Sequence, residues 1–250
     1  MLLNVSHPFL PKQNSTRASL VTDHFGIDFE EGEHVIARDL ELPVAPGQIV
    51  LFTGESGSGK SSLMRRVAAE LKQQDFHVVD LENLICEERI LVDLLPLPLE
   101  SALQLLVACG LGEAHLMLRT PRELSDGQRY RFRLALALAQ EPDWIVADEF
   151  TATLDRRLAR MIAFNLQKIS ARNHVGFLLA TTHEDIVVDL HADLHVQCRL
   201  DGTIQYESSL AEPGIKKKVA GSPAISGSPP RPNPTGRISL GGIIAAITSD

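Results

Sequence analysis

Residues 54–61 hold residue types that bind phosphate. They read Gly-Glu-Ser-Gly-Ser-Gly-Lys-Ser and match the pattern G-x-x-x-x-G-K-[ST]. A continuous apolar run, residues 49–52, precedes them, and apolar residues at helical spacing follow. In this strand–loop–helix order the glycines let backbone N–H groups converge on a phosphate, and the start of the helix adds its positive end. We therefore expect Lys60 to bridge β- and γ-phosphates and the Ser61 hydroxyl to reach magnesium.

The residues of this phosphate loop that we expect to contact a nucleotide are Gly54, Glu55, Ser56, Gly57, Ser58, Gly59, Lys60, Ser61 and Ser62. A Gly/Ser-rich stretch is often a plain loop. The Lys-Ser ending and the strand before it favour phosphate binding here.

Two acids end a second predicted strand. The apolar residues 144–147 are followed by Asp148 and Glu149. Adjacent carboxylates at the edge of a sheet are costly unless a positive group lies there, and Mg²⁺ meets that need. We expect Asp148 to hold the metal and Glu149 to be the general base that polarises an attacking water, a role typically worth ~10²–10⁴ in rate. A surface Asp-Glu pair is the ordinary alternative.

Apolar strands alternate with helical patterns through most of the chain. This alternation predicts an α/β fold with a mostly parallel sheet and helices on both faces. The expected strands are residues 49–52, 76–79, 144–147 and 176–181, with short antiparallel strands near 35–36 and 40–42 and a hairpin of 194–200 with 203–206. The expected helices are residues 99–109, 125–140 and 154–169.

Composition divides the chain into three parts. Residues 1–20 are mixed polar and predict a flexible N-terminal arm, and residues 21–210 carry the folded domain. Residues 211–250 are rich in Pro, Gly and Ser, a composition that predicts a largely disordered tail. The closing run 238–247 is apolar enough to dock against another surface, which the sequence does not identify.

The composition also excludes some classes of protein. A net charge of −8 argues against a surface that grips nucleic acid or anionic lipid throughout. The three cysteines are scattered, as is typical of a reducing compartment, and no run approaches ~18 apolar residues. We therefore expect a cytoplasmic protein without a transmembrane segment of its own. Nucleic-acid binding stays possible, but Arg129, Arg131 and Arg133 are better read as solvated or structural residues.

Three further segments make the chain resemble the ATP-binding cassette (ABC) ATPases. Residues 124–128, Leu-Ser-Asp-Gly-Gln, precede an apolar helix and are similar to the family's signature loop, usually Leu-Ser-Gly-Gly-Gln. Residues 153–155, Thr-Leu-Asp, resemble the D-loop, and His183, after the strand 176–181, resembles the switch histidine. With the phosphate loop and the two acids, the five segments follow one fixed order, and the resemblance covers about residues 25–207.

The resemblance implies a P-loop NTPase with trimmed helical and antiparallel subdomains that binds ATP and Mg²⁺. It also implies a homodimer that sandwiches ATP between the phosphate loop of one subunit and the signature loop of the other. Ser125, Asp126, Gly127 and Gln128 would contact the twin's nucleotide, and Asp155 would line the dimer seam. Catalysis would involve Lys60, Glu149 and His183, the last at the γ-phosphate.

The chain departs from the family pattern at several positions. Asp126 replaces a glycine and adds negative charge near phosphate, which weakens the closed dimer unless the carboxylate points away. No glutamine stands at the Q-loop, where Asp93 is the best substitute as a metal ligand. The aromatic residue that stacks on adenine is Phe25 or Phe29, of which we take Phe29.

The short middle of the chain and the missing glutamine bear on function, because both normally contribute to the socket for a membrane partner. We therefore expect a soluble, non-transporter ABC ATPase that drives or regulates an unidentified partner protein. It resembles most the soluble ABC-type ATPases often fused to a predicted acetyltransferase domain. The alternative is the cytosolic ATP-binding subunit of an ABC transporter. A small-molecule P-loop kinase would leave residues 124–128 and His183 without a role.

Overall fold

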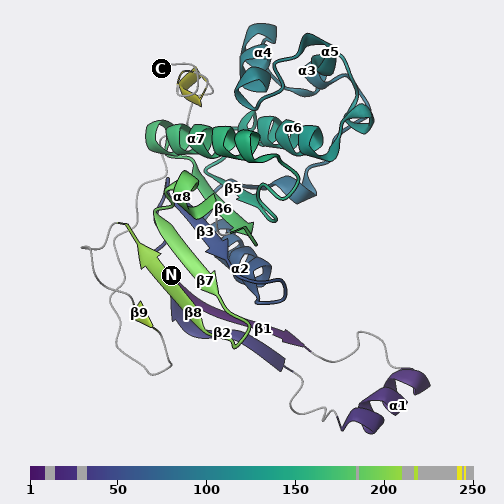
Figure 1. Cartoon of the computed structure of the whole chain (residues 1–250), viewed down its shortest axis with the longest axis vertical. Helices are drawn as coiled ribbons and strands as arrows, with labels where there is room; N and C mark the ends of the chain where they lie inside the picture. Colours follow the sequence, from purple (N-terminus) through teal and green to yellow (C-terminus); the bar gives the residue numbers. More distant parts are fainter. Residues whose placement is uncertain are drawn as a thin grey trace.

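A seven-stranded sheet forms the centre of the computed structural model, which describes residues 1–8, 15–26, 33–183, 186–209, 217–218, 241–243 and 245 (Figure 1). The strand order is β4-β5-β6-β3-β7-β8-β9. The strands from β4 to β7 in this order are parallel, and β8 and β9 extend the sheet in antiparallel fashion. Their bounds are β3 Ile49–Thr53, β4 Val78–Asp80, β5 Trp144–Ala147, β6 Gly176–Thr181, β7 Leu194–Cys198, β8 Ile204–Ser208 and β9 Lys217–Lys218. The predicted mostly parallel sheet is confirmed.

Helices cover both faces of the sheet, and the side chains of β3 show how. Ile49 and Leu51 belong to one hydrophobic core, which also holds residues of α4, α6 and α7. Val50 and Phe52 belong to a second core, with residues of α2. The long helices are α2 Lys60–Gln73, α4 Leu99–Ala108, α6 Asp126–Leu138 and α7 Arg156–Asn173. A strand buried on both faces reads as a continuous apolar run, which is why the sequence predicted it well.

A helical region fills the chain between β4 and β5. Short elements accompany α4 and α6 here: η1 Leu81–Asn83, α3 Leu91–Leu94, α5 Ala114–Met117 and η2 Pro121–Glu123. After β6, α8 Ile186–Leu190 packs against α7. In the parts of the chain that the structure describes, none of the helices combines the length and apolar character needed to cross a bilayer.

The N-terminus differs from its predicted form. Residues 2–8 were expected in a flexible arm, yet β1 Leu2–Pro8 pairs antiparallel with β2 Glu33–Glu41. Leu3 and Val5 point inward and are 0% and 7% exposed, whereas Leu2 is 61% exposed. Burial of this alternate face holds the strand in place, so the expectation of a loose arm was wrong for these residues. The two short strands expected near residues 35–42 are one strand, β2.

Part of the remaining expected arm is helical. Helix α1 runs from Thr16 to Phe25, with the Ser15 hydroxyl accepting a hydrogen bond from the Ala18 N–H at its start and Gly26 in the left-handed region at its end. Such caps satisfy backbone groups that a helix end leaves unpaired.

Within the predicted tail, the described residues are ordered into β9 and a helical turn at residues 241–243. Ile243 is fully buried in the same core as α7, and the Arg172 guanidinium on α7 donates to the Ala245 carbonyl at 3.3 Å. These residues of the apolar closing run therefore pack against the core beside α7, a position that the sequence did not identify. The other residues of 211–250 lie outside those that the structure describes.

The inward side of β1 gives a stability test. Leu3→Ala should lower the free energy of unfolding by about 2–5 kcal/mol, the usual cost of emptying a buried leucine site. Leu2→Ala, one residue earlier on the exposed side, is the matched control and should change it by less than about 0.5 kcal/mol. Urea unfolding curves measure both free energies. Equal effects of the two variants would contradict a packed strand β1 and support a flexible arm at residues 2–8.

Candidate nucleotide-binding site

The phosphate loop joins the carboxyl end of β3 to the start of α2. Gly54 and Gly59 have φ values of 141° and 88°, which favour glycine. A Cβ on Gly54 would collide with the Cys198 carbonyl oxygen, and one on Gly59 would lie 2.6 Å from Ile36 Cγ2. The backbone thus passes where no side chain fits, and the loop encloses a cradle at the N-terminus of α2.

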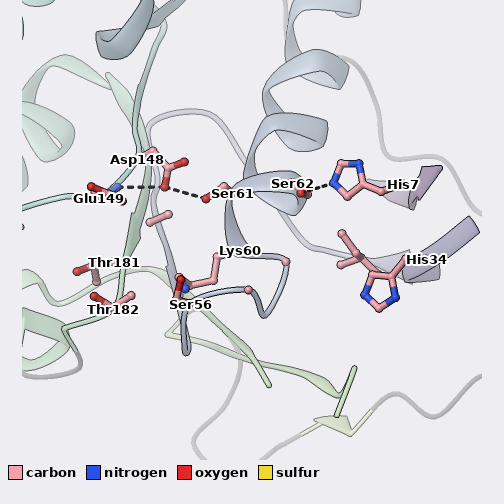
Figure 2. A pocket seen from close by; sticks show the side chains of 14 residues that line it. His7, His34, Ser56, Lys60, Ser61, Ser62, Asp148, Glu149, Thr181 and Thr182 are labelled. Carbon is pink, nitrogen blue, oxygen red and sulfur yellow. Dashed lines mark hydrogen bonds between the residues drawn. The ribbon is translucent and has the colours of Figure 1, made fainter. Parts of the chain in front are cut away.

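A cavity of about 260 Å³ opens at this cradle (Figure 2). Figure 2 shows Asp148, Glu149, Thr181 and Thr182 on one side of the phosphate loop and His7 and His34 on the other. The lining residues are His7, His34, Ile36, Ser56, Gly57, Gly59, Lys60, Ser61, Ser62, Asp148, Glu149, Ala180, Thr181 and Thr182. The cavity therefore gathers the two motifs that the sequence singled out, at the shared carboxyl edge of β3, β5 and β6.

Two polar side chains of the loop are nearly buried. Lys60 is 7% exposed, and its ammonium donates to the Glu55 carbonyl at 2.6 Å. Ser58 is 8% exposed, and its hydroxyl oxygen has no hydrogen-bond partner in the described part of the chain. A buried hydroxyl without a partner is unusual in a folded protein. The Lys60 ammonium and the start of α2, which do line the cavity, suit a phosphate group. Gly54, Glu55 and Ser58 shape the loop without lining the cavity.

Ser61 and Asp148 form a pair of oxygen groups suited to magnesium. The Ser61 hydroxyl donates to Asp148 Oδ1 at 3.0 Å, and the Glu149 N–H donates to the same oxygen at 3.0 Å (Figure 2). Only 10% of the Asp148 side chain is exposed. Hydroxyl and carboxylate oxygens are the ligands that Mg²⁺ takes beside a bound triphosphate, so these residues fit the metal.

The backbone of Glu149 is held in a sparsely populated conformation. Its φ is 48°, in the left-handed region, and the next residue, Phe150, is fully buried. The Phe150 N–H donates to the Ala180 carbonyl of β6 at 2.7 Å. Strain of this kind persists only where the surrounding structure enforces it. The anchored Phe150 therefore fixes the direction of Glu149, whose side chain is exposed and lines the cavity.

Sequence reasoning missed an arginine that bridges two acids. Arg65 Nη2 lies 3.3 Å from Asp148 Oδ2 and 3.4 Å from Glu82 Oε2. Partial burial, followed by the Asp148 carboxylate, raises the pKa of Glu82. Glu82 follows β4, the neighbour of β5 in the sheet, so a survey of acids after each parallel strand would have found it.

Several predicted site residues lie outside the cavity. Asp93 is exposed on α3 and does not line it, so the structure brings Glu82 rather than Asp93 beside Asp148. Phe29 lies outside the described residues, and the alternative, Phe25, is 75% exposed and does not line the cavity. His183 is exposed next to the lining residue Thr182, and its N–H donates to the Thr181 hydroxyl at 3.1 Å.

The signature loop presents a capped helix tip. The Ser125 hydroxyl accepts from the Gln128 N–H at 3.3 Å, and the Gln128 side chain accepts from the Ser125 N–H at 3.0 Å. This reciprocal capping box starts α6. Ser125 is exposed, and residues 125–128 do not line the cavity of their own chain.

The charge of Asp126 has a partner on the same helix. Arg129 Nη1 lies 3.1 Å from Asp126 Oδ1, and the same guanidinium donates to the Pro121 and Leu124 carbonyls at 3.2 and 3.0 Å. The expected structural role of Arg129 is therefore confirmed. The Asp126 side chain is 79% exposed. Its charge is thus partly compensated by an ion pair that water screens.

Asp155 of the D-loop caps helix α7, since its carboxylate accepts a hydrogen bond from the Leu158 N–H at 3.0 Å.

No family model matches the chain. Comparisons with curated proteins and with solved structures find ATP-binding proteins and ABC cassettes. The lipoprotein-releasing system ATP-binding protein LolD of Pseudomonas syringae pv. tomato is 29% identical over 205 residues, 67% of this chain and 89% of that protein. A putative peptide import ATP-binding protein of Brucella abortus (strain 2308) is 27% identical over 242 residues, 76% of this chain and 69% of that protein. The dimeric structure of MJ0796, a bacterial ABC transporter cassette, matches with a TM-score of 0.60 at 20% identity over 88% of this chain and 99% of that one.

The chain has the fold of the ATP-binding cassette ATPases, and the relatives that it resembles are named as ATP-binding proteins. The ABC ATPase fold is shared with MJ0796, which is also known in a post-hydrolysis state bound to ADP and Pi. The relative LolD is named as an ATP-binding protein, and the phosphate loop with Ser61 and Asp148 suits a nucleoside triphosphate bound together with Mg²⁺. The relatives do not support the finer resemblance to ATPases fused to an acetyltransferase domain.

The ammonium group of Lys60 gives a binding test in this ABC ATPase domain. Lys60→Ala should weaken ATP binding about 10- to 100-fold, because a charge-assisted hydrogen bond is worth about 1.5–3 kcal/mol. Lys72→Ala removes an exposed lysine near the other end of α2 and should leave the affinity unchanged. Titration calorimetry measures both dissociation constants, and equal values for Lys60→Ala and the unmodified protein would exclude Lys60 from the site.

Proposed function

We propose that this ABC ATPase domain is the ATP-binding subunit of a transporter and hydrolyses ATP as a head-to-tail, nucleotide-sandwich homodimer. One observation carries the dimer: the cavity gathers the phosphate loop, Asp148 and Glu149, whereas the capped tip at residues 125–128 lies outside it. A second copy of the chain would bring its own tip to the open side of this cavity. There the positive end of α6 complements a γ-phosphate.

The relatives support the transporter role. LolD is named for a lipoprotein-releasing system, and the Brucella protein for peptide import. The sequence favoured a stand-alone ATPase, and its alternative, the transporter subunit, fits these relatives better. Large apolar residues are also exposed in the helical region between β4 and β5: Ile85 (88%), Leu99 (65%) and Leu118 (66%). Exposed apolar residues that gather into one patch are typical of a contact with another protein, and these three are the candidates for such a patch.

Lys60 and the loop N–H groups would hold the β- and γ-phosphates. Ser61 and Asp148 would hold the metal, which neutralises charge on the phosphate oxygens when bound. Glu82 would stand where the family has the Q-loop glutamine, with Arg65 keeping it near Asp148. Its carboxylate replaces an amide at that position.

Glu149 would act as the general base. As the oxygen of a bound water attacks the γ-phosphorus, its proton passes to the Glu149 carboxylate, and the bond from that phosphorus to the ADP oxygen breaks. The enforced backbone of Glu149 and the buried Phe150 keep the carboxylate aimed into the cavity. His183, next to Thr182, would reach the γ-phosphate from the end of β6.

The nucleoside would lie against the two-stranded sheet of β1 and β2. Because Asp148 and Glu149 mark the γ-phosphate end, the nucleotide must extend from the loop toward the opposite wall, where His7, His34 and Ile36 line the cavity (Figure 2). His7 Nε2 lies 2.5 Å from Ser62 Oγ, which ties this wall to α2. An imidazole face next to an isoleucine suits a purine or ribose, and it takes the place that the sequence assigned to Phe29.

Glu149→Gln tests the catalytic assignment and the dimer. The variant should keep ATP affinity, because glutamine retains the shape of the side chain, and lose about 10²–10⁴ in turnover, because the amide accepts no proton. With ATP and Mg²⁺ it should accumulate as a dimer, which analytical ultracentrifugation detects. Glu141→Gln, an exposed glutamate before β5, is the matched control and should hydrolyse ATP normally. Hydrolysis at the normal rate by Glu149→Gln would remove this residue from the catalytic role.

The same variant identifies the partner. Tagged Glu149→Gln protein, incubated with ATP and Mg²⁺ and detergent-solubilised membranes, should retain a membrane protein with several spans, because the trapped dimer presents its docking surface continuously. The control uses ADP in place of ATP and should retain less of it. Mass spectrometry reads the eluate. Enrichment of a stand-alone enzyme or a nucleic acid instead would favour the non-transporter reading.

A further inference from the structure

We infer that Gly127 is a positioning residue: it lets the signature helix α6 and the D-loop of the same chain pack directly together, so that the two segments and Glu149 move as one unit. This inference rests on the proposed sandwich dimer and goes beyond it. In that dimer the signature loop and the D-loop would contact different parts of the second copy. The inference concerns how the two loops keep a fixed position relative to each other in the single chain.

The decisive contact lies at the second residue of α6. A Cβ on Gly127 would lie 2.7 Å from the Thr153 carbonyl oxygen and 3.5 Å from Leu154 Cδ2. Real Cβ atoms do not approach another atom so closely, and the oxygen belongs to the backbone, so it cannot swing away as a side chain can. The helical φ of Gly127 suits any residue, so the requirement at this position is space alone.

Arg131, one turn further along α6, joins the same elements. Its Nε donates to the Gly127 carbonyl at 3.1 Å, and its Nη1 donates to the Gly110 carbonyl at the end of α4. Burial lowers the pKa of Arg131, and the Asp155 carboxylate of the D-loop opposes that shift. The arginine therefore holds the backbone of α6 while its charge attracts the D-loop.

The D-loop leads back to Glu149. The Ala152 N–H donates to the Glu149 carbonyl at 2.9 Å, and the Leu154 N–H donates to the Thr151 carbonyl at 3.0 Å. Residues 149–154 thus form consecutive hydrogen-bonded turns, with φ values of 48° at Glu149 and 67° at Thr151. A shift of Thr153 strains this run. A catalytic group misplaced by about 1 Å can lower the reaction rate about 10²-fold. The position of α6 relative to the D-loop therefore affects catalysis by Glu149, the proposed base.

Two roles for residue 127 predict different effects of alanine. Alanine keeps the backbone N–H, so a residue that served only to donate this N–H to the twin's phosphate would tolerate Gly127→Ala. A residue that serves by close packing would not, because the added methyl group forces α6 and the D-loop apart.

The experiment compares Gly127→Ala with Gly112→Ala, both in the full-length chain. A Cβ on Gly112 meets only Val107 atoms, at 3.5 Å and beyond, so this control adds the same methyl group without a collision. We expect Gly127→Ala to lower kcat for ATP hydrolysis at least tenfold with KM unchanged. In the nucleotide-free monomer we expect faster hydrogen–deuterium exchange at the amides of residues 151–155. Gly112→Ala should leave both measurements as in the unmodified protein.

Unchanged exchange at residues 151–155 in Gly127→Ala overturns the inference, whether or not hydrolysis falls. Because that measurement uses the monomer, it stands even when Glu149→Gln fails to dimerise and the proposed function is lost. If Gly127→Ala does not unfold cooperatively, Leu154→Ala takes its place, since it empties the other side of the same contact. Faster exchange at 151–155 then supports the inference, and unchanged exchange overturns it.

Discussion

The site depends on one geometric constraint: parallel strands all end at the same edge of their sheet. Thr53 of β3 lies beside Thr181 of β6, and Ala147 of β5 lies beside Leu179. The residues that directly follow these strands must therefore meet. That edge brings the phosphate loop, Asp148 and Thr182 around one cavity, although they are far apart in the sequence. An antiparallel arrangement of the same strands would send some of these groups to the opposite end.

The same edge concentrates negative charge. Glu82, Asp148 and Glu149 follow neighbouring strands, and their mutual repulsion opposes folding. Arg65 offsets part of it by contacting two of the three carboxylates, and Lys60 lines the same cavity as Asp148. A metal ion would relieve the remainder, which agrees with the proposal that the site binds ATP together with Mg²⁺. The carboxylates whose repulsion lowers the stability of the fold are thus the groups that would attract the metal ion.

Local patterns predicted the elements whose signal is local. Strands β5 and β6 were predicted with the bounds that the structure has, because each is a continuous apolar run with clear ends. Ser61 and Asp148 were each expected at a magnesium ion from their own motifs, and their side chains are hydrogen-bonded to each other. The contact of Asp126 with Arg129 is also local, three residues along a helix, and its spacing is visible in the sequence.

Features that depend on distant pairing were missed. Strand β1 has only Leu3 and Val5 on its inward side, too short an alternation to identify without its partner β2. His7 and His34 reach the cavity only because these strands pair, which no spacing indicates. Asp93 was chosen by its place along the chain, whereas the acid beside Asp148 is set by which strand adjoins β5.

The capping box at Ser125 has a consequence for the speed and cost of association. Because the Ser125 and Gln128 side chains already satisfy each other's backbone, the tip of α6 is rigid in the single chain. Freezing a free side chain at an interface costs about 0.5–1.5 kcal/mol, and here that entropy is lost on folding instead of on docking. Because of this preorganisation, the tip needs no change of conformation when two copies associate. Nucleotide occupancy, rather than reshaping of the tip, would then determine how long the dimer lasts.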